Sequence, residues 1–198
     1  MKKLMIAAAI VCAAVVSQAA TIKWSANGLK GTDGETTVAN NSVEMYTFEL
    51  TDAAYSFMTQ YASDNGVDAA QKYLYENFSE GTLKVNDVAQ TAYSGNPKKV
   101  YSGTINSGTK TLALDTTYNA ATILLYTEDG DDYYMGNVAT YTAPAEGTLN
   151  SVTYGSMGSL WLGEGGSAAI GWQSVPEPTS GLLLLLGVAG LALRRRRA

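Results

Sequence analysis

Ala121-Thr-Ile-Leu-Leu-Tyr-Thr127 and Asp132-Tyr-Tyr-Met-Gly-Asn-Val138 are two runs of strand-forming residues that flank the turn-forming tetrapeptide Glu128-Asp129-Gly130-Asp131. Threonine, isoleucine, valine and tyrosine fit the pleated surface of a sheet. Aspartate and glycine readily adopt the positive φ angles that a tight hairpin turn requires. The segment therefore predicts an antiparallel hairpin and, with it, a mainly β fold.

Runs of the same kind recur along the chain, and clusters of Gly, Asn, Asp and Ser separate them. We expect strands at 21–24, 42–50, 82–85, 88–93, 99–105, 110–115, 121–127, 132–141, 149–154, 160–162 and 168–172. A second hairpin is predicted by 99–105 and 110–114, which flank Asn106-Ser107-Gly108. The regular spacing predicts a β-sandwich-like fold, for which a jelly-roll and an immunoglobulin-like arrangement both remain open.

A small helical insertion is predicted at 52–79. Thr51 or Asp52 can cap a first run, which stops at Asp64-Asn65-Gly66, and a second run with apolar residues at helical spacing follows from 68 to 78. We expect this helical pair to cover one end or edge of the sheet. Three of its large side chains are expected to be core contacts: Met58, Tyr61 and Phe78.

The 198-residue chain contains no histidine and a single cysteine, Cys12. Without imidazole, histidine-based acid–base catalysis and histidine-ligated metals are excluded. Thirteen Lys and Arg against 18 Asp and Glu give an acidic balance, which argues against nucleic acid as a partner. We expect no cofactor.

Residues 1–19 have the pattern of a secretory signal peptide, since two lysines precede a 13-residue apolar run at 4–16. Ser17-Gln18-Ala19 supplies small residues for signal peptidase, so cleavage is predicted between Ala19 and Ala20. The apolar run is shorter than the ~20 residues of a membrane-spanning helix. Because Cys12 lies inside this segment, the exported body contains no thiol and no disulfide.

The C-terminal end combines a proline-rich strip, an apolar segment at 181–193 and a cationic cluster. The strip is Val175, Pro176, Glu177 and Pro178, and the cluster is Arg194, Arg195, Arg196 and Arg197. The prolines favour an extended backbone. The apolar segment is about 20 Å long as a helix, short of the ~30 Å hydrocarbon core, and the arginines predict a cytoplasmic end. A plain single-span anchor is the alternative interpretation.

This arrangement resembles the PEP-CTERM sorting tail of Gram-negative bacteria that make extracellular polysaccharide, over residues 175–198. The resemblance implies that exosortase, a membrane cysteine transpeptidase, recognises Pro176, Glu177 and Pro178 and cuts the tail. It further implies that the body passes to the cell surface or extracellular matrix, where extracellular polysaccharide is a candidate partner.

The exported body at 20–174 has the length of a single domain, with seven lysines, 17 acidic residues and hence a net charge of −10. An acidic hairpin tip is its densest polar cluster: Glu128, Asp129, Asp131 and Asp132. Carboxylates of this kind can bind Ca²⁺, but the order of ligands in an EF-hand loop is missing. We favour a solvated turn without metal.

Aromatic residues are concentrated in the body and offer a candidate glycan-stacking platform. Its members are Trp24, Tyr133, Tyr134, Trp161 and Trp172. Ordinary packing in strands explains the same residues, and we favour that explanation.

Carboxylate chemistry is the one catalytic route that the composition leaves. Glu44 and Glu49 are five residues apart on one predicted strand, so their side chains are expected on opposite faces, and Glu164 stands alone. We therefore expect a non-enzymatic surface or matrix protein with a structural or adhesive role. A secreted carbohydrate-binding module is the main alternative, and a carboxylate-dependent glycan hydrolase is a third possibility.

Overall fold

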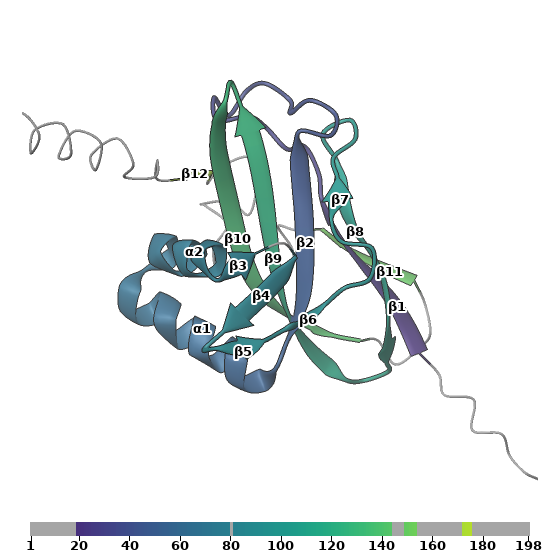
Figure 1. Cartoon of the computed structure of the whole chain (residues 1–198). Helices are drawn as coiled ribbons and strands as arrows, with labels where there is room; N and C mark the ends of the chain where they lie inside the picture. Colours follow the sequence, from purple (N-terminus) through teal and green to yellow (C-terminus); the bar gives the residue numbers. More distant parts are fainter. Residues whose placement is uncertain (1–18, 80, 144–148, 154–171, 176–198) are drawn as a thin grey trace, which may run out of the picture.

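The computed structural model describes residues 19–79, 81–143, 149–153 and 172–175 (Figure 1). The predicted mainly β fold is confirmed, with two short helices. The elements, in chain order, are β1 (Ala19–Ala26), β2 (Val43–Leu50), α1 (Asp52–Asn65), α2 (Val67–Glu76), β3 (Phe78–Ser79), β4 (Thr82–Val85), β5 (Val88–Ala89), β6 (Thr91–Ala92), β7 (Lys98–Lys99), β8 (Ile105–Ala113), β9 (Thr117–Glu128), β10 (Asp131–Thr142), β11 (Leu149–Thr153) and β12 (Gln173–Ser174).

A central antiparallel sheet has the strand order β12-β10-β9-β2-β6, and β7 also pairs with β2. Its longest pair of strands is the β9–β10 hairpin, which is paired without a break from Glu128 opposite Asp131 to Thr117 opposite Thr142. Asp129 and Gly130 form the turn with φ angles of 54° and 93°. The predicted hairpin is therefore confirmed, including the positive φ angles expected of its turn.

A second sheet has the order β11-β1-β8, in which β1 is parallel to β11 and antiparallel to β8. The predicted hairpin around Asn106-Ser107-Gly108 is wrong, because these residues lie inside β8. The pairing skips from Thr109 to Asn106, so the turn-like residues form a bulge in a continuous strand.

The turn before β8 instead uses Ser102 and Gly103, with φ angles of 50° and 68°, between the mutually bonded residues Tyr101 and Thr104. Gly103 is also sterically required, since a Cβ atom there would lie 2.8 Å from the Thr37 side chain. Ser102-Gly103 and Ser107-Gly108 have the same local sequence. Because Asn106 and Thr109 are paired with β1, the chain turns at Ser102-Gly103 and not at Ser107-Gly108.

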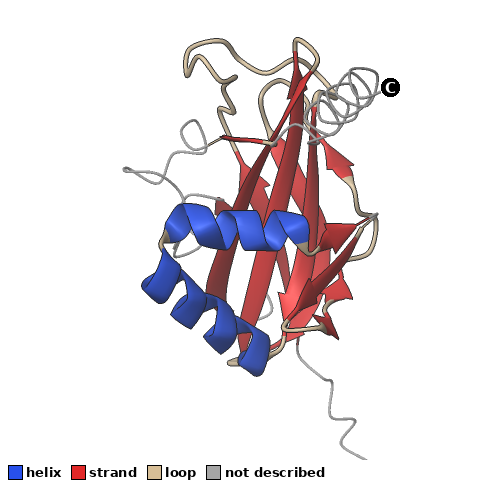
Figure 2. Cartoon of the chain, turned by 60° about the vertical axis from the view of Figure 1, so that its left-hand side comes forward, coloured by secondary structure: helices blue, strands red, loops and turns tan. Residues whose placement is uncertain are grey.

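The two helices lie across one face of the central sheet (Figure 2). Thr51 is the N-cap of α1, where its hydroxyl accepts a hydrogen bond from the Ala54 amide at 3.2 Å, and α1 ends at Gly66 with φ 89°. A small β3-β4-β5 sheet adjoins the helices (Figure 1). Met58 and Leu74 are fully buried, as predicted for Met58.

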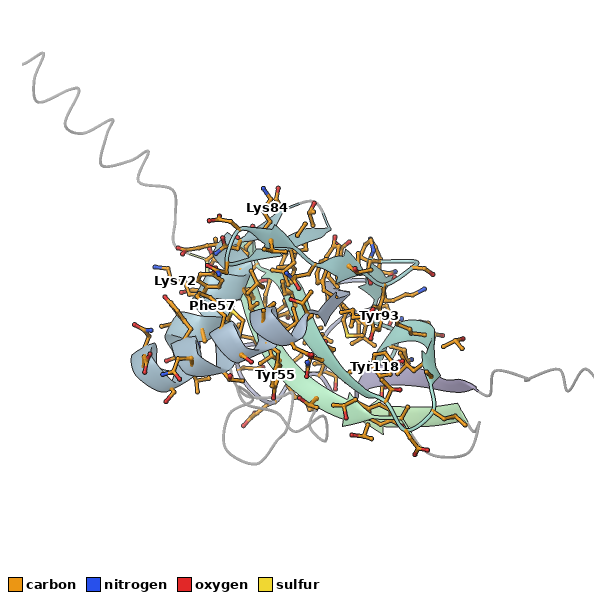
Figure 3. All side chains as sticks on the ribbon, turned by 90° about the horizontal axis from the view of Figure 1, so that it is seen from below. Tyr55, Phe57, Lys72, Lys84, Tyr93 and Tyr118 are labelled. Atoms are coloured by element: carbon orange, nitrogen blue, oxygen red, sulfur yellow. The ribbon has the colours of Figure 1, made fainter. Side chains whose placement is uncertain are left out.

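The expectation that the helices cover an end or edge of the sheet is wrong, because they cover a face. Six consecutive residues of β9, Asn119–Leu124, are buried, as are six of β10, Tyr134–Ala139. Strands buried on both sides need a layer on each face. Figure 3 shows the result: Tyr93 and Tyr118 lie on the side toward β1, away from Phe57 on α1.

Among the described residues, one apolar cluster lies on each face of the central sheet. On the helix face, Phe48, Ile123 and Val138 pack with residues of α1 and α2, and Tyr61 and Phe78 are partly buried against this cluster. On the opposite face, Met45, Leu124 and Met135 share a cluster with residues of β1 and β8.

Within the described ranges, no helix is long and apolar enough to cross a membrane. Residues 1–18 of the predicted signal peptide and the apolar segment at 181–193 lie outside those ranges, whereas Ala19, its last residue, begins β1.

Candidate functional site

The last described segment, residues 172–175, is tied to the body at the edge of the central sheet. The Trp172 indole N–H donates to the backbone carbonyl of Lys30 at 2.9 Å, and its ring lies 5.0 Å from that of Tyr126. An indole that is partly buried and bonded in this way is an anchor rather than an exposed platform.

Directly after this anchor, β12 pairs with the outer edge of β10. Gln173 lies opposite Tyr134 and Ser174 opposite Tyr133, and the Val175 amide donates to the Asp132 carbonyl at 2.9 Å. The Gln173 side chain also reaches the Asp68 carboxylate of α2 at 3.3 Å. We call residues 172–175 the clasp.

The clasp brings the first residue of the predicted sorting strip, Val175, to the tip of the β9–β10 hairpin. A proline has no amide hydrogen, so neither Pro176 nor Pro178 can donate a backbone hydrogen bond. Pro176, Glu177, Pro178 and the four arginines Arg194–Arg197 lie outside the described residues.

At the acidic hairpin tip, Glu128 binds the loop that contains Thr32. Glu128 accepts hydrogen bonds from the Thr32 amide at 3.1 Å, the Thr32 hydroxyl at 2.5 Å and the Tyr126 hydroxyl at 2.6 Å. These bonds, first of all that from the Thr32 hydroxyl, lower the pKa of Glu128. Gly31 makes this approach possible, since a Cβ atom there would lie 2.5 Å from the Glu128 carboxylate.

The other acidic residues of the tip do not join Glu128. Asp132 accepts a hydrogen bond from the Thr127 hydroxyl at 2.7 Å. Among the residues with described side chains, no three acidic groups come together as metal ligands. The arrangement gives Glu128 a structural role at the end of the sheet.

The predicted glycan platform is divided between the two faces of β10. Tyr133 packs near Tyr126 on the face toward the second sheet, whereas the neighbouring Tyr134 stacks on Tyr75 of α2 at 4.3 Å and 11°. Adjacent strand residues point to opposite faces, so these two tyrosines cannot share a surface. Trp161 and the side chain of Trp24 lie outside the described part of the chain.

A shallow hollow of about 330 Å³ adjoins the clasp on the sheet surface. It was not predicted. Its lining includes Tyr133 and Asp132 from the predicted sites, and also Glu44 and Tyr75. The docking of α2 on β10 brings Tyr75 there, and no local sequence signal reports that contact.

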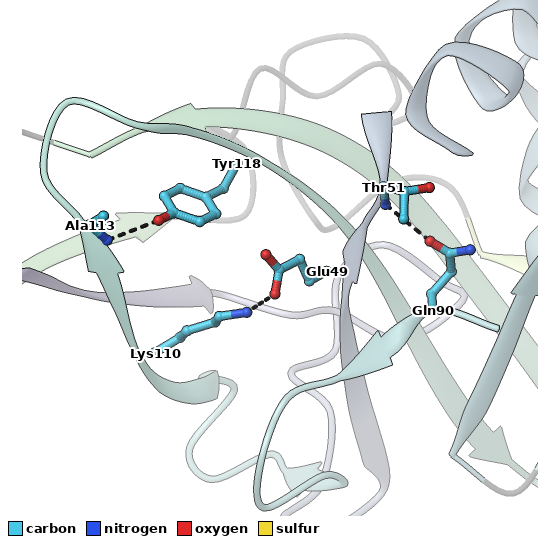
Figure 4. A network of polar contacts seen from close by, with 6 residues as sticks. All are labelled: Glu49, Thr51, Gln90, Lys110, Ala113 and Tyr118. Carbon is cyan, nitrogen blue, oxygen red and sulfur yellow. Dashed lines mark hydrogen bonds and ion pairs between the residues drawn. The ribbon is translucent and has the colours of Figure 1, made fainter. Parts of the chain in front are cut away.

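Glu44 and Glu49 lie on opposite faces of β2, as their spacing predicted. Glu44 pairs with Lys99 at 3.1 Å, and Glu49 pairs with Lys110 on the other face (Figure 4). Partial burial lowers the pKa of Lys110, whose ammonium lies 4.9 Å from the centre of the Tyr93 ring. Glu164 lies outside the described residues.

The same corner contains two further hydrogen bonds (Figure 4). The Ala113 amide donates to the Tyr118 hydroxyl at 2.9 Å, and the Thr51 amide donates to the Gln90 side-chain carbonyl at 3.2 Å. These bonds join β8 to β9 and fix the start of α1, so they serve the fold.

A β-rich body followed directly by a proline-rich strip, an apolar segment and four arginines defines a protein with a C-terminal sorting tail. Residues 174–197 match the PEP-CTERM protein-sorting motif. The predicted tail is thereby confirmed, and it marks an exported protein of the kind that exosortase sorts at the membrane of Gram-negative bacteria. No curated protein matches the chain.

Proposed function

We propose that the chain is a tail-sorted protein of the cell surface or extracellular matrix, whose body has a structural or adhesive role without catalysis. The observation that carries this proposal is the sorting motif at 174–197. The sequence from Ala20 onward contains no histidine and no cysteine, which supports a non-enzymatic body. The described body consists of β-sheets with two helices on one face of the central sheet, and a folded body of this kind can be carried as the cargo of a sorting tail.

The clasp supports a close coupling between cargo and tail. Ser174 belongs both to β12 and to the matched motif, and Val175 is bonded to β10. The five residues 176–180 span at most about 18 Å when fully extended. While the apolar segment is in the membrane, the hairpin tip therefore stays near the membrane surface.

The experiment compares the wild-type chain with a Pro176→Ala/Pro178→Ala variant in cells that export it. We expect the wild type to reach the surface fraction with an intact mass that shows cleavage before Ala20 and within the tail. The variant should stay uncut in the inner membrane.

Thr179→Ala is the control, because it changes the residue directly after the strip and keeps both prolines. Normal release of the double variant contradicts recognition of the strip. Retention of the control variant together with the double variant also contradicts it, since any change in the segment would then suffice.

A secreted carbohydrate-binding module is the second candidate function, and the hollow beside the clasp favours it. Selective retention of the protein on a polysaccharide supports binding. Release of new reducing ends from that polysaccharide contradicts a non-catalytic role and points to a hydrolase.

A further inference from the structure

The hollow beside the clasp is built from five parts of the chain. The segment before β2 supplies Asn41 and Ser42, β2 supplies Glu44, and the hairpin, α2 and the clasp supply the rest of the lining. The remaining lining residues are Tyr75, Leu125, Tyr126, Thr127, Asp132, Tyr133 and Val175. A volume of about 330 Å³ is at the lower end of the ~300–1,000 Å³ of small-molecule sites.

Tyr75 is the fixed aromatic wall of the hollow. One face of its ring stacks on Tyr134, which is 4% exposed, at a centroid distance of 4.3 Å. Burial, and then the nearby Asp132 carboxylate, raise the pKa of Tyr75, so the hydroxyl keeps its proton. A rigid tyrosine of this kind offers an apolar ring and a hydrogen-bond donor at low entropic cost.

Hydrogen-bonding groups surround that wall. The side-chain amide of Asn41 is exposed and bonds to no described residue, and the Asp132 carboxylate accepts a hydrogen bond from the Thr127 hydroxyl. Glu44 is paired with Lys99 and with the Tyr46 hydroxyl at 3.1 Å. The hollow therefore combines an aromatic face with amide, hydroxyl and carboxylate groups.

The charge of the lining selects among ligands. Asp132 and Glu44 are acidic, Glu44 is partly neutralised by its ion pair with Lys99, and the described residues of the lining include no lysine or arginine. Sugars that bear carboxylate or sulfate groups are repelled, whereas neutral sugars and amino sugars are accepted.

We propose that this hollow is a saccharide-binding site for a neutral or amine-bearing sugar unit, with Tyr75 as the stacking surface and Asp132 and Asn41 as hydrogen-bond partners. This proposal names the class of ligand that the adhesive role proposed above would use, and it rests on that role. Because Val175 closes one side, the bound sugar lies next to the point where the sorting tail leaves the body.

The test is affinity electrophoresis of the full chain in detergent, in gels that contain hydroxyethyl cellulose, glycol chitosan or alginate. We expect retardation by the neutral or the amine-bearing polymer and none by alginate, which carries uronic acids. Tyr75→Ala should weaken the binding about tenfold.

Tyr101→Ala is the matched control, since Tyr101 is 73% exposed on the turn before β8 and lies outside the hollow. Asp132→Asn is a second variant of nearly unchanged shape, which tests the site even if Tyr75→Ala fails to fold. We expect several-fold weaker binding for Asp132→Asn at an unchanged melting temperature.

Three outcomes overturn the site: no retardation of the wild type by either non-anionic polymer, stronger retardation by alginate, or equal losses in Tyr101→Ala and the two site variants. Fractionation reports the proposed location separately. A correctly located protein without retardation overturns the saccharide site and leaves the sorting intact.

Discussion

The two faces of the central sheet are both covered but chemically different. On the helix face, Phe48, Ile123 and Val138 form a continuous apolar surface under α1 and α2. On the inner face, toward the second sheet, Thr47, Thr122 and Asn137 lie opposite one another across β2, β9 and β10. One face is thus made of close apolar packing, and the other carries a polar row through its middle.

The polar row is an energetic exception within the described part of the chain. All three side chains are 0% exposed, and the Thr47 hydroxyl, the Thr122 hydroxyl and both side-chain atoms of Asn137 have no hydrogen-bond partner. A buried polar group without a partner costs about 1–3 kcal/mol. We infer that the stability of the body comes mainly from the apolar residues of both faces, and that the row reduces it.

The largest expected effect is on the helix face. Leu74 is fully buried between α2 and β10, so Leu74→Ala should lower the free energy of unfolding by about 2–5 kcal/mol. Val67→Ala, at the exposed start of the same helix, should change it by less than about 0.5 kcal/mol. Urea denaturation of both variants provides the measurement. Equal effects would show that the helices are not packed into the core.

A smaller effect is expected from filling space on that face. A Cβ atom at Gly136 would lie 3.1 Å from the Leu74 side chain, so Gly136→Ala should cost about 1–3 kcal/mol. In the Leu74→Ala background the clash is removed, and the cost should largely disappear. A double-mutant cycle measures the coupling. Additive losses in the two variants would contradict close packing between α2 and β10.

The two faces also differ in how far the sequence predicts them. The hairpin at 121–138 and a helix cap at Thr51 or Asp52 follow from local residue preferences, and the structure has the hairpin and a cap at Thr51. The helix layer was misplaced to an edge, because the surface on which a helix packs is a tertiary property. Asn137 appears in the sequence as an ordinary strand residue, and only the register opposite Thr122 shows that it is buried.

The candidate sites follow the same division. The tail could be read from sequence because its recognition depends on the order of linear segments. The hollow could not, since Tyr75 and Glu44 are 31 positions apart and meet through the docking of α2. The Ser102-Gly103 turn was missed for a related reason: Asn106-Ser107-Gly108 is an equally good local turn, and the pairing with β1 excludes it.

On the inner face, Thr122→Val should raise the free energy of unfolding by up to about 1 kcal/mol, because it removes a buried hydroxyl without a partner at nearly constant volume. Thr140→Val is the control on β10, where the hydroxyl donates to the Asn119 side chain at 2.9 Å. That control should lose about 0.5–1 kcal/mol. Thermal and urea unfolding measure both. A clear loss of stability in Thr122→Val would mean that the Thr122 hydroxyl forms a hydrogen bond in solution. The chemical contrast between the two faces would then be weaker than the structure indicates.

The smallest expected effect is at the rim of the inner face, where Glu128 holds the loop that contains Thr32. The pKa of Glu128 is below its usual 4.5 in the folded chain because the Thr32 hydroxyl donates to the carboxylate. A folded-state pKa below the unfolded-state value stabilises the fold fully above the unfolded-state pKa, and this contribution is lost as the pH falls through the folded-state pKa. The carboxylate is exposed, so solvent screens the effect and the shift in melting temperature should be small.

The melting temperature measured from about pH 6 down to about pH 3 should therefore fall less steeply for Glu128→Gln than for the wild type. Asp131→Asn, at the same hairpin tip, should follow the wild type. Identical curves for all three proteins mean that Glu128 does not hold the loop, and the two faces of the sheet then differ in their middle and not at their rim.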